Sequence, residues 1–399
     1  MAFVPKKVLK REKGSEVMSM YTIMGPVLYG EGTVKKVGSE LKRMKTSHVF
    51  IVTDGVMTQQ PGFEAAIQSI KDKEIKYTIF DKVVSDPPDT LILEAVEEMK
   101  KAGADGIMAF GGGSIIDTAK AVNVMLNNPP PVSQYEMNPK KARGVKILAV
   151  PTTSGTGSEA TTVAVITDSA RGVKICLLES VSRAILDPEL TYTVPAGLTA
   201  GNGMDVFAHS TEAIFSKGNS PFSDVMAKDA MGRVMKYLPT AVNEPSNKEA
   251  RAQMMIASTF AGTAFTNSGN NIGHAVAHAV GATLHIPHGV ACAQAMAAYP
   301  KFIWSRSPER IIMMAQAMGL DVADGDDPEK VADKVQKATV ELMKAIKIPS
   351  LKSEYSLDQV KNDTVAEKAM GDMTMGFVPG PPVTKEEMLQ LLEDTYNAY

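Results

Sequence analysis

The order of apolar runs along the chain is the feature that most constrains its fold. Between residues 48 and 126, short apolar runs rich in β-branched residues alternate with segments of helical period. The runs lie at residues 48–54, 76–81 and 106–110, and a further run follows at 146–150. Strands that alternate with helices in this way predict a parallel sheet with helices on its faces.

The pattern changes after about residue 195, where nearly every segment has helical period. We therefore expect an α/β half over residues 1–195 and an all-helical half over 196–399, with residues 1–20 as a loose N-terminal arm. Residues 21–41 predict a hairpin or edge strands that lead into a helix. The last helix is expected to begin after Thr384, with Glu387 completing a capping box.

Composition excludes several classes of protein. The chain has 399 residues, of which 44% are hydrophobic, and its net charge of −3 gives no general attraction to nucleic acid or to an anionic membrane. No run approaches the ~18 apolar residues of a membrane span, and the basic N-terminus lacks the apolar region of a signal peptide. Cys176 and Cys292 belong to no CxxC pair, so we expect a reduced, cytoplasmic protein with structural cysteines.

Two glycine-rich turns follow predicted strands. The first, at residues 111–114 (GGGS), enters a helix, where backbone N–H groups can approach a phosphate. The second, at residues 151–159 (PTTSGTGSE), combines hydroxyl groups with two glycines. The first turn is neither GxGxxG nor a Walker loop, and taken alone a triple glycine fits a purely structural turn as well as a phosphate site. Asp54 ends another strand, where it could bind ribose hydroxyls or cap a loop.

Histidines are concentrated in one segment. Four of the six fall within residues 270–289, and a fifth, His209, follows Asp205 by four positions. Asp205 and His209 therefore share a helix face, as do His274 and His278, although spacing does not decide which of the latter pair is a ligand. One carboxylate with several imidazoles and no thiolate suits Fe(II), Zn or a similar ion.

The remaining two histidines of this segment differ in context. His288 lies between a proline and a glycine, as expected of a ligand that a turn brings in, whereas His285 fits a core or capping residue. Histidine is the commonest metal ligand, and such crowding in a histidine-poor chain indicates a site.

Four segments resemble signature blocks of the iron-dependent (group III) alcohol dehydrogenases. They are GGGSIIDTAK, PTTSGTGSEAT, GMDVFAHSTEA and GHAVAHAVGATLHIPHG, in family order. The resemblance, from about residue 21 to the C-terminus, implies an α/β dinucleotide-binding domain over residues 1–195. It also implies a helical metal- and substrate-binding domain over residues 196–399, with the site in the cleft between the two.

The resemblance also assigns residues. It implies that the metal ligands are Asp205, His209, His274 and His288. It implies that the dinucleotide is lined by Gly112, Gly113, Ser114, Asp117, Thr152, Thr153, Thr161 and Lys174. Asp54 matches the position at which a carboxylate favours NAD over NADP, and His278 would be the catalytic histidine that faces the nicotinamide. Val163 and Phe265 would wall the pocket of a small, largely apolar primary alcohol.

The implied function is an NAD-dependent alcohol dehydrogenase that interconverts a small primary alcohol and its aldehyde. It would use one divalent metal, Fe(II) in preference to Zn, and form a homo-oligomer, a dimer or larger. A dehydroquinate-synthase-like or glycerol-dehydrogenase-like enzyme on the same fold is the alternative. The first of these needs Lys and Arg around Asp205 and residues 274–288, where the sequence has none. A metal hydrolase without nucleotide would leave both glycine turns unexplained.

Overall fold

The computed structural model describes residues 21–138 and 142–399 of the chain. These residues divide into two compact units, one ending at Leu190 and the other beginning at Thr191, except that Thr153–Gly157 belongs to the second unit. The predicted N-terminal arm, residues 1–20, lies outside the described residues.

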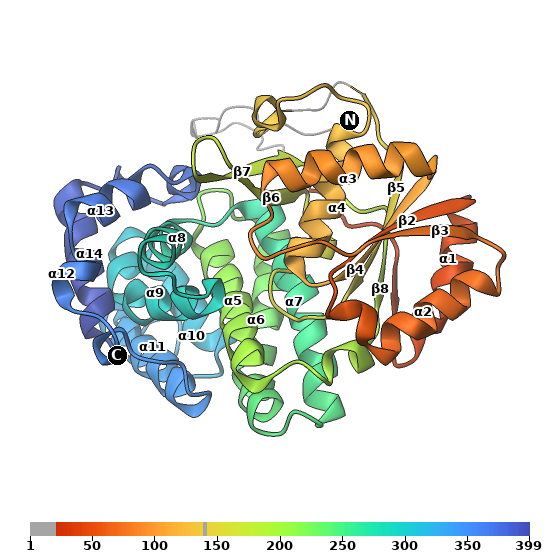
Figure 1. The fold of residues 1–399 in the computed structure, drawn as a ribbon. Coiled ribbons are helices and arrows are strands. Elements are labelled where there is room, and N and C mark those ends of the chain that lie inside the picture. Colours follow the sequence, from red (N-terminus) through yellow and green to blue (C-terminus); the bar gives the residue numbers. More distant parts are fainter. Residues whose placement is uncertain (1–20, 139–141) are drawn as a thin grey trace, which may run out of the picture. The chain divides into compact units, whose positions relative to one another are not determined.

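The first unit is built on a six-stranded parallel sheet (Figure 1) of order β1-β8-β5-β4-β2-β3. Its strands are β1 (Val27–Tyr29), β2 (His48–Val52), β3 (Lys76–Phe80), β4 (Gly106–Gly111), β5 (Lys146–Pro151) and β8 (Arg183–Leu186). A separate antiparallel pair consists of β6 (Val163–Asp168) and β7 (Val173–Leu178). The predicted parallel sheet is therefore confirmed, with four of its strands at the apolar runs of the sequence.

Helices cover both faces of this sheet. They are α1 (Val37–Arg43), α2 (Pro61–Lys71), α3 (Asp89–Ala102) and α4 (Gly113–Met125). Val49 and Ile51 of β2 are buried in one apolar cluster with α1 and α2, whereas Phe50, between them, points to the opposite face. Such strands carry apolar residues on both sides because a parallel sheet is buried on both faces.

The edge of the sheet agrees with one of the two alternatives expected for residues 21–41. These residues form an edge strand rather than a hairpin, because β1 pairs in parallel with β8, Val27 opposite Ala184, and α1 follows it. The strand β8 was missed, since the prolines that follow it made the region read as a series of turns. Its pairing with β1 and β5 is long-range, and it buries Ile185 completely.

The second unit is helical. Its helices are α5 (Ala196–Phe215), α6 (Pro221–Asn243), α7 (Lys248–Ser268), α8 (Ile272–Leu284), α9 (His288–Ile303), α10 (Pro308–Ala317), α11 (Pro328–Ala345), α12 (Leu357–Val360), α13 (Asp363–Met370) and α14 (Lys385–Asn397). α5 packs against α6, α7 and α9 and is buried almost all round, which makes it a rigid support for polar side chains. The predicted capping box of α14 is present, with Thr384 and Glu387 bonded reciprocally. None of the helices in the described residues is long and apolar enough to span a membrane.

Candidate active site

Three helices of the second unit bring the predicted metal ligands together. α5 carries Asp205 and His209 on one face, α8 carries His274 in its first turn, and His288 begins α9. The start of α9 lies directly against α5, where a Cβ on Gly289 would be 2.3 Å from the carbonyl oxygen of Gly201. Gly289 therefore permits the close approach that places His288 beside Asp205.

Asp205 is the centre of this cluster. Its Oδ1 lies 3.6 Å from Nε2 of His209 and 3.5 Å from Nε2 of both His274 and His288. The residue is 2% exposed, and Oδ1 has no hydrogen-bond partner among the described residues. A buried carboxylate oxygen without a hydrogen bond is costly unless a cation accompanies it.

The spacing of these atoms fits a metal ion. Bonds of about 2.0–2.2 Å to nitrogen and oxygen, at the angles of a tetrahedron or octahedron, separate neighbouring donor atoms by roughly 3.0–3.6 Å. The contacts of 3.5–3.6 Å around Asp205 lie at the upper end of that range and are too long for hydrogen bonds. The donor set is thus arranged for a first-row divalent ion.

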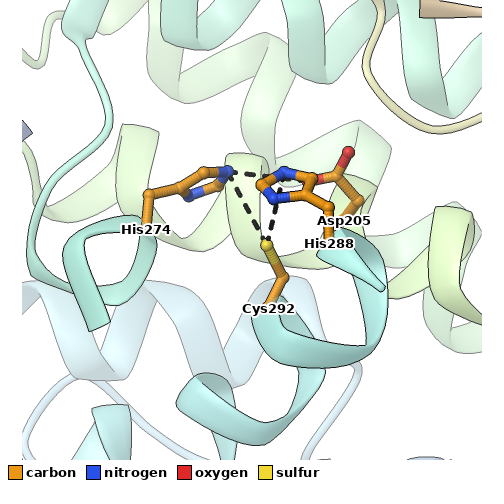
Figure 2. A group of neighbouring side chains, drawn as sticks. All are labelled: Asp205, His274, His288 and Cys292. Atoms are coloured by element: carbon orange, nitrogen blue, oxygen red, sulfur yellow. Dashed lines mark hydrogen bonds and ion pairs between the residues drawn. The ribbon is translucent and has the colours of Figure 1, made fainter. Parts of the chain in front are cut away.

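A cysteine also lies in the cluster, contrary to the sequence interpretation, which placed no thiolate here and treated both cysteines as structural. Cys292 Sγ lies 3.6 Å from Nε2 of His288 and 3.9 Å from Nε2 of His274. Figure 2 shows its sulfur directed at both imidazoles. The spacing from His288 to Cys292 is four residues on one helix, the same spacing that linked Asp205 to His209. Its apolar neighbours in the sequence concealed this relation.

Glu212 is a further buried residue of the site that the sequence did not single out. It lies on the same face of α5 as Asp205, seven positions later, and is completely buried. Its Oε2 accepts the Nδ1 proton of His274, and its Oε1 accepts the backbone N–H groups of Asn271 and His274 at 3.0 and 2.9 Å. The proton on Nδ1 leaves the Nε2 lone pair of His274 directed toward Asp205.

Charge within the cluster sets its protonation. Burial lowers the pKa of His209 to about 3, so this ring is neutral at pH 7. Burial also opposes the protonation of His288, but Cys292 and Asp205 outweigh it and raise the pKa of His288 to about 10. The pKa of His274 is likewise raised against burial, chiefly by Glu212. A metal ion that binds here displaces protons from the imidazoles.

His278 lies next to the cluster, one turn after His274 on α8. Its ring stacks on that of His288 at 5.4 Å between centroids, and its Nδ1 lies 2.8 Å from Oδ2 of Asp372. Burial lowers the pKa of His278, although Asp372 opposes the shift. The structure thus holds a neutral imidazole with Nδ1–H donated to a carboxylate and Nε2 available to accept a proton.

The predicted pocket residues lie in different units. Phe265 of α7 stacks on His209 with ring centroids 4.2 Å apart, so an apolar ring adjoins the cluster around Asp205. Val163 begins β6, and its carbonyl oxygen accepts a hydrogen bond from the buried Nζ of Lys120 at 2.8 Å. His285, expected to be a core or capping residue, is the left-handed C-cap of α8.

The GGGS turn stands at the end of β4 and the start of α4. Gly112 is the N-cap of α4, and Gly113 and Ser114 are its first residues, so their N–H groups are at a helix N-terminus. Gly111 has φ of 152°, and a Cβ there would lie 2.1 Å from Cδ1 of Ile115. The turn is therefore built for close backbone packing and leaves helix-terminal donors for an anion.

Several other predicted dinucleotide residues have structural contacts within their unit. Asp117 accepts a hydrogen bond from Ser158 Oγ at 2.5 Å and from the backbone N–H of Val165 at 3.0 Å. Thr161 Oγ1 accepts one from Lys120 Nζ at 2.9 Å. These contacts fix residues 158–165 against α4.

The last predicted dinucleotide residues lie at strand ends and turns. Asp54 Oδ1 caps the turn after β2 by accepting the N–H groups of residues 56 and 57, each at 2.8 Å. Lys174 forms an ion pair of 2.7 Å with Asp86. Thr152 is buried directly after β5, and Thr153 begins the segment that belongs to the second unit.

Both halves of the chain match known protein families. The model of the iron-containing alcohol dehydrogenases matches residues 25–188, and that of the C-terminal part of the Fe-containing alcohol dehydrogenase family matches residues 199–396. The chain belongs to the iron-containing alcohol dehydrogenase family.

Individual relatives cover almost the whole chain. It is 34% identical over 381 residues to the NAD-dependent methanol dehydrogenase of Bacillus methanolicus, covering 94% of this chain and 100% of the relative. It is 32% identical over 391 residues to the NADPH-dependent butanol dehydrogenase of Clostridium saccharobutylicum, with coverage of 95% and 98%. The solved alcohol dehydrogenase from Oenococcus oeni is similar with a TM-score of 0.90 and 29% identity, over 95% of this chain and 100% of that one.

These similarities confirm the main predictions from the sequence. The fold class, the enzyme class of NAD(P)-dependent alcohol dehydrogenase, and the cofactors NAD and a divalent metal all agree with the family. The alternative, a dehydroquinate-synthase-like or glycerol-dehydrogenase-like enzyme, is not favoured, because these relatives are methanol and butanol dehydrogenases.

Proposed function

We propose that this dehydrogenase interconverts a small primary alcohol and its aldehyde at a centre that holds Fe(II) in preference to Zn. The observation that carries the proposal is Asp205 Oδ1, buried beside three imidazole nitrogens and lacking a hydrogen bond among the described residues. The proposed ligands are Asp205, His209, His274 and His288. When bound, such an ion supplies Lewis-acid polarisation of the alcohol or aldehyde oxygen.

For NAD we propose the residues around the GGGS turn. The N–H groups of Gly112, Gly113 and Ser114 at the start of α4 suit the pyrophosphate, and Asp54 Oδ2 is left by its turn-capping contacts to accept ribose hydroxyls. Asp117, Thr152, Thr153, Thr161 and Lys174 complete the proposed set. A carboxylate at position 54 repels a 2′-phosphate, which supports NAD over NADP.

His278 is proposed to move the proton of the reaction. Asp372 accepts the proton on Nδ1 and so fixes the tautomer in which Nε2 is a base. Because burial lowers the pKa of His278, the ring is neutral at pH 7 and can accept a proton from the alcohol side. In aldehyde reduction the same nitrogen returns it.

The substrate is proposed to be small and largely apolar. Phe265, stacked on His209, places an aromatic face beside the ligand cluster, and Val163 is the second proposed pocket residue. The methanol and butanol dehydrogenases named above, which match the chain over at least 94% of its length, support short alcohols. We further propose a cytoplasmic homo-oligomer, a dimer or larger, with residues 1–195 binding the dinucleotide and residues 196–399 binding the metal and substrate.

The test combines a substrate panel with ligand variants. Protein of measured iron and zinc content is assayed with primary alcohols and aldehydes of increasing length, with NAD(H) and with NADP(H). We expect the highest kcat/KM with short primary alcohols or their aldehydes and NAD(H), and loss of bound metal together with turnover in His274→Ala and His288→Ala. Full metal content and full turnover in both variants would contradict the ligand assignment.

A further inference from the structure

Cys292 has a position among the ligand atoms that the proposed set of one carboxylate and three imidazoles leaves unused. It lies one helical turn after His288 on α9, and it is 1% exposed. Its Sγ, the Nε2 atoms of His274 and His288, and a carboxylate oxygen of Asp205 all lie within 4.8 Å of one another (Figure 2). Three helices of the second unit, α5, α8 and α9, contribute these four atoms.

Hydrogen bonding does not account for this convergence. The ring of His274 donates its Nδ1 proton to Glu212, so its Nε2 is a lone pair in the neutral ring. Asp205 Oδ1 is an acceptor as well, and a thiol has one proton to give. With the ring of His274 neutral, acceptors from His274 and Asp205 therefore face one point together with a sulfur, an arrangement that a cation satisfies and a single S–H does not.

The distances agree with coordination. A sulfur about 2.3 Å and a nitrogen about 2.05 Å from one metal, with a bond angle of about 110° between them, are roughly 3.6 Å apart. The observed separations of Cys292 Sγ are 3.6 Å to His288 and 3.9 Å to His274. We propose that Cys292 ligates the metal as a thiolate, in addition to Asp205, His209, His274 and His288. The inference rests on the proposed function for the location of the metal, and it adds a donor to the set named there.

A thiolate at this place leaves room for substrate. Cys292 approaches from the protein interior, whereas the side chain of His288 is 36% exposed. The exposed side of the cluster, with His288 and the adjacent His278, stays open to an alcohol oxygen. A sulfur ligand also suits a first-row ion such as Fe(II) or Zn better than it suits Mg or Mn.

The test uses the full-length protein with Co(II) in place of the native metal. Bound Co(II) gives visible d–d absorption whatever its ligands, and a thiolate ligand adds a charge-transfer band in the near ultraviolet. We expect both signals in the wild type and in Cys176→Ala, the control for the other cysteine. Cys292→Ala should keep the d–d bands, lose the charge-transfer band, and bind the ion about tenfold or more weakly in chelator competition.

The outcomes separate this inference from the proposed function. Visible Co(II) bands without a charge-transfer band in the wild type would overturn the thiolate ligand and leave the metal centre intact. Absence of any bound Co(II), or its retention in a variant lacking Asp205 and His274, would overturn the metal centre itself. X-ray absorption of the wild-type zinc protein is independent of any variant: a sulfur scatterer at about 2.3 Å supports the proposal, and a shell of nitrogen and oxygen alone contradicts it.

Discussion

The replacement Glu212→Gln tests whether a buried carboxylate sets the tautomer of His274. One oxygen of Glu212 accepts two backbone N–H groups, and the other accepts the ring proton of His274. The amide of glutamine has one acceptor oxygen for these two roles. If the oxygen stays on the backbone groups, the NH₂ meets Nδ1–H, and His274 relieves the clash by moving its proton to Nε2, where it can no longer bind a metal.

The expected magnitude follows from these contacts. Loss of a carboxylate that orients a metal-binding histidine lowers metal affinity about 10–100-fold, which is about 1.4–2.7 kcal/mol of binding free energy. If the amide turns the other way, a buried donor meets two N–H groups, and the metal-free protein loses about 1–3 kcal/mol of its free energy of unfolding. Glu212→Gln therefore weakens either metal binding or the fold.

The assay is chelator competition with Zn or Co(II), together with thermal unfolding of the metal-free protein. The matched control is Glu354→Gln, an exposed glutamate of the same unit, which should change neither quantity. Wild-type metal affinity and wild-type stability in Glu212→Gln would refute the role assigned to this carboxylate.

Three further predictions concern charge. Lys120→Met removes the ammonium that donates to the carbonyl oxygens of Ser158, Thr161 and Val163. Urea titration should therefore show that the free energy of unfolding falls by about 3 kcal/mol, and NAD should bind more weakly. An unchanged free energy of unfolding would count against this contact. Asp372→Asn removes a carboxylate that raises the pKa of His278. The kcat should therefore fall about tenfold, and the acid limb of its pH profile should move to lower pH, with metal content unchanged. An unshifted acid limb would exclude the pairing of Asp372 with His278. The pKa of His288, raised to about 10 in the metal-free protein, makes its contribution to stability complete below about pH 6.5 and lost as pH rises through about 10. Metal affinity should run the opposite way, rising up to about tenfold per pH unit for each displaced proton, and a pH-independent chelator competition would contradict this.

The parts of the fold that the sequence predicted are those with strong local signals. β2, β4 and β5 are apolar runs with buried side chains on both faces. The start of α14 is marked by a capping box, with Thr384 as the N-cap and Glu387 in the first turn. β8 has four residues and follows no such pattern, because its place between β1 and β5 depends on long-range pairing. The same lack of local signal left a hairpin and an edge strand as equal alternatives for residues 21–41.

The residues of the candidate site also differ in how strong a signal they give in the sequence. Asp205, His209 and His274 could be predicted as site residues because histidine is scarce and helical spacing is regular. Glu212 and Cys292 obey that spacing too, seven positions after Asp205 and four after His288, but a glutamate or a cysteine in a helix is common without a metal. Asp372 gave no local signal, since it reaches His278 from 94 positions away in a loop rich in Gly, Pro and Met.

The central claim is that the enzyme transfers a hydride from a primary alcohol to NAD and that this transfer depends on the metal. It is tested most directly with butan-1-ol deuterated at the carbinol carbon, incubated with NAD and either metal-loaded or metal-depleted protein. The account predicts deuterium in the reduced nicotinamide with the loaded protein, none of this product after depletion, and its recovery when Fe(II) is restored. Deuterated nicotinamide formed at the same rate without metal, or reduced nicotinamide free of deuterium, would contradict it.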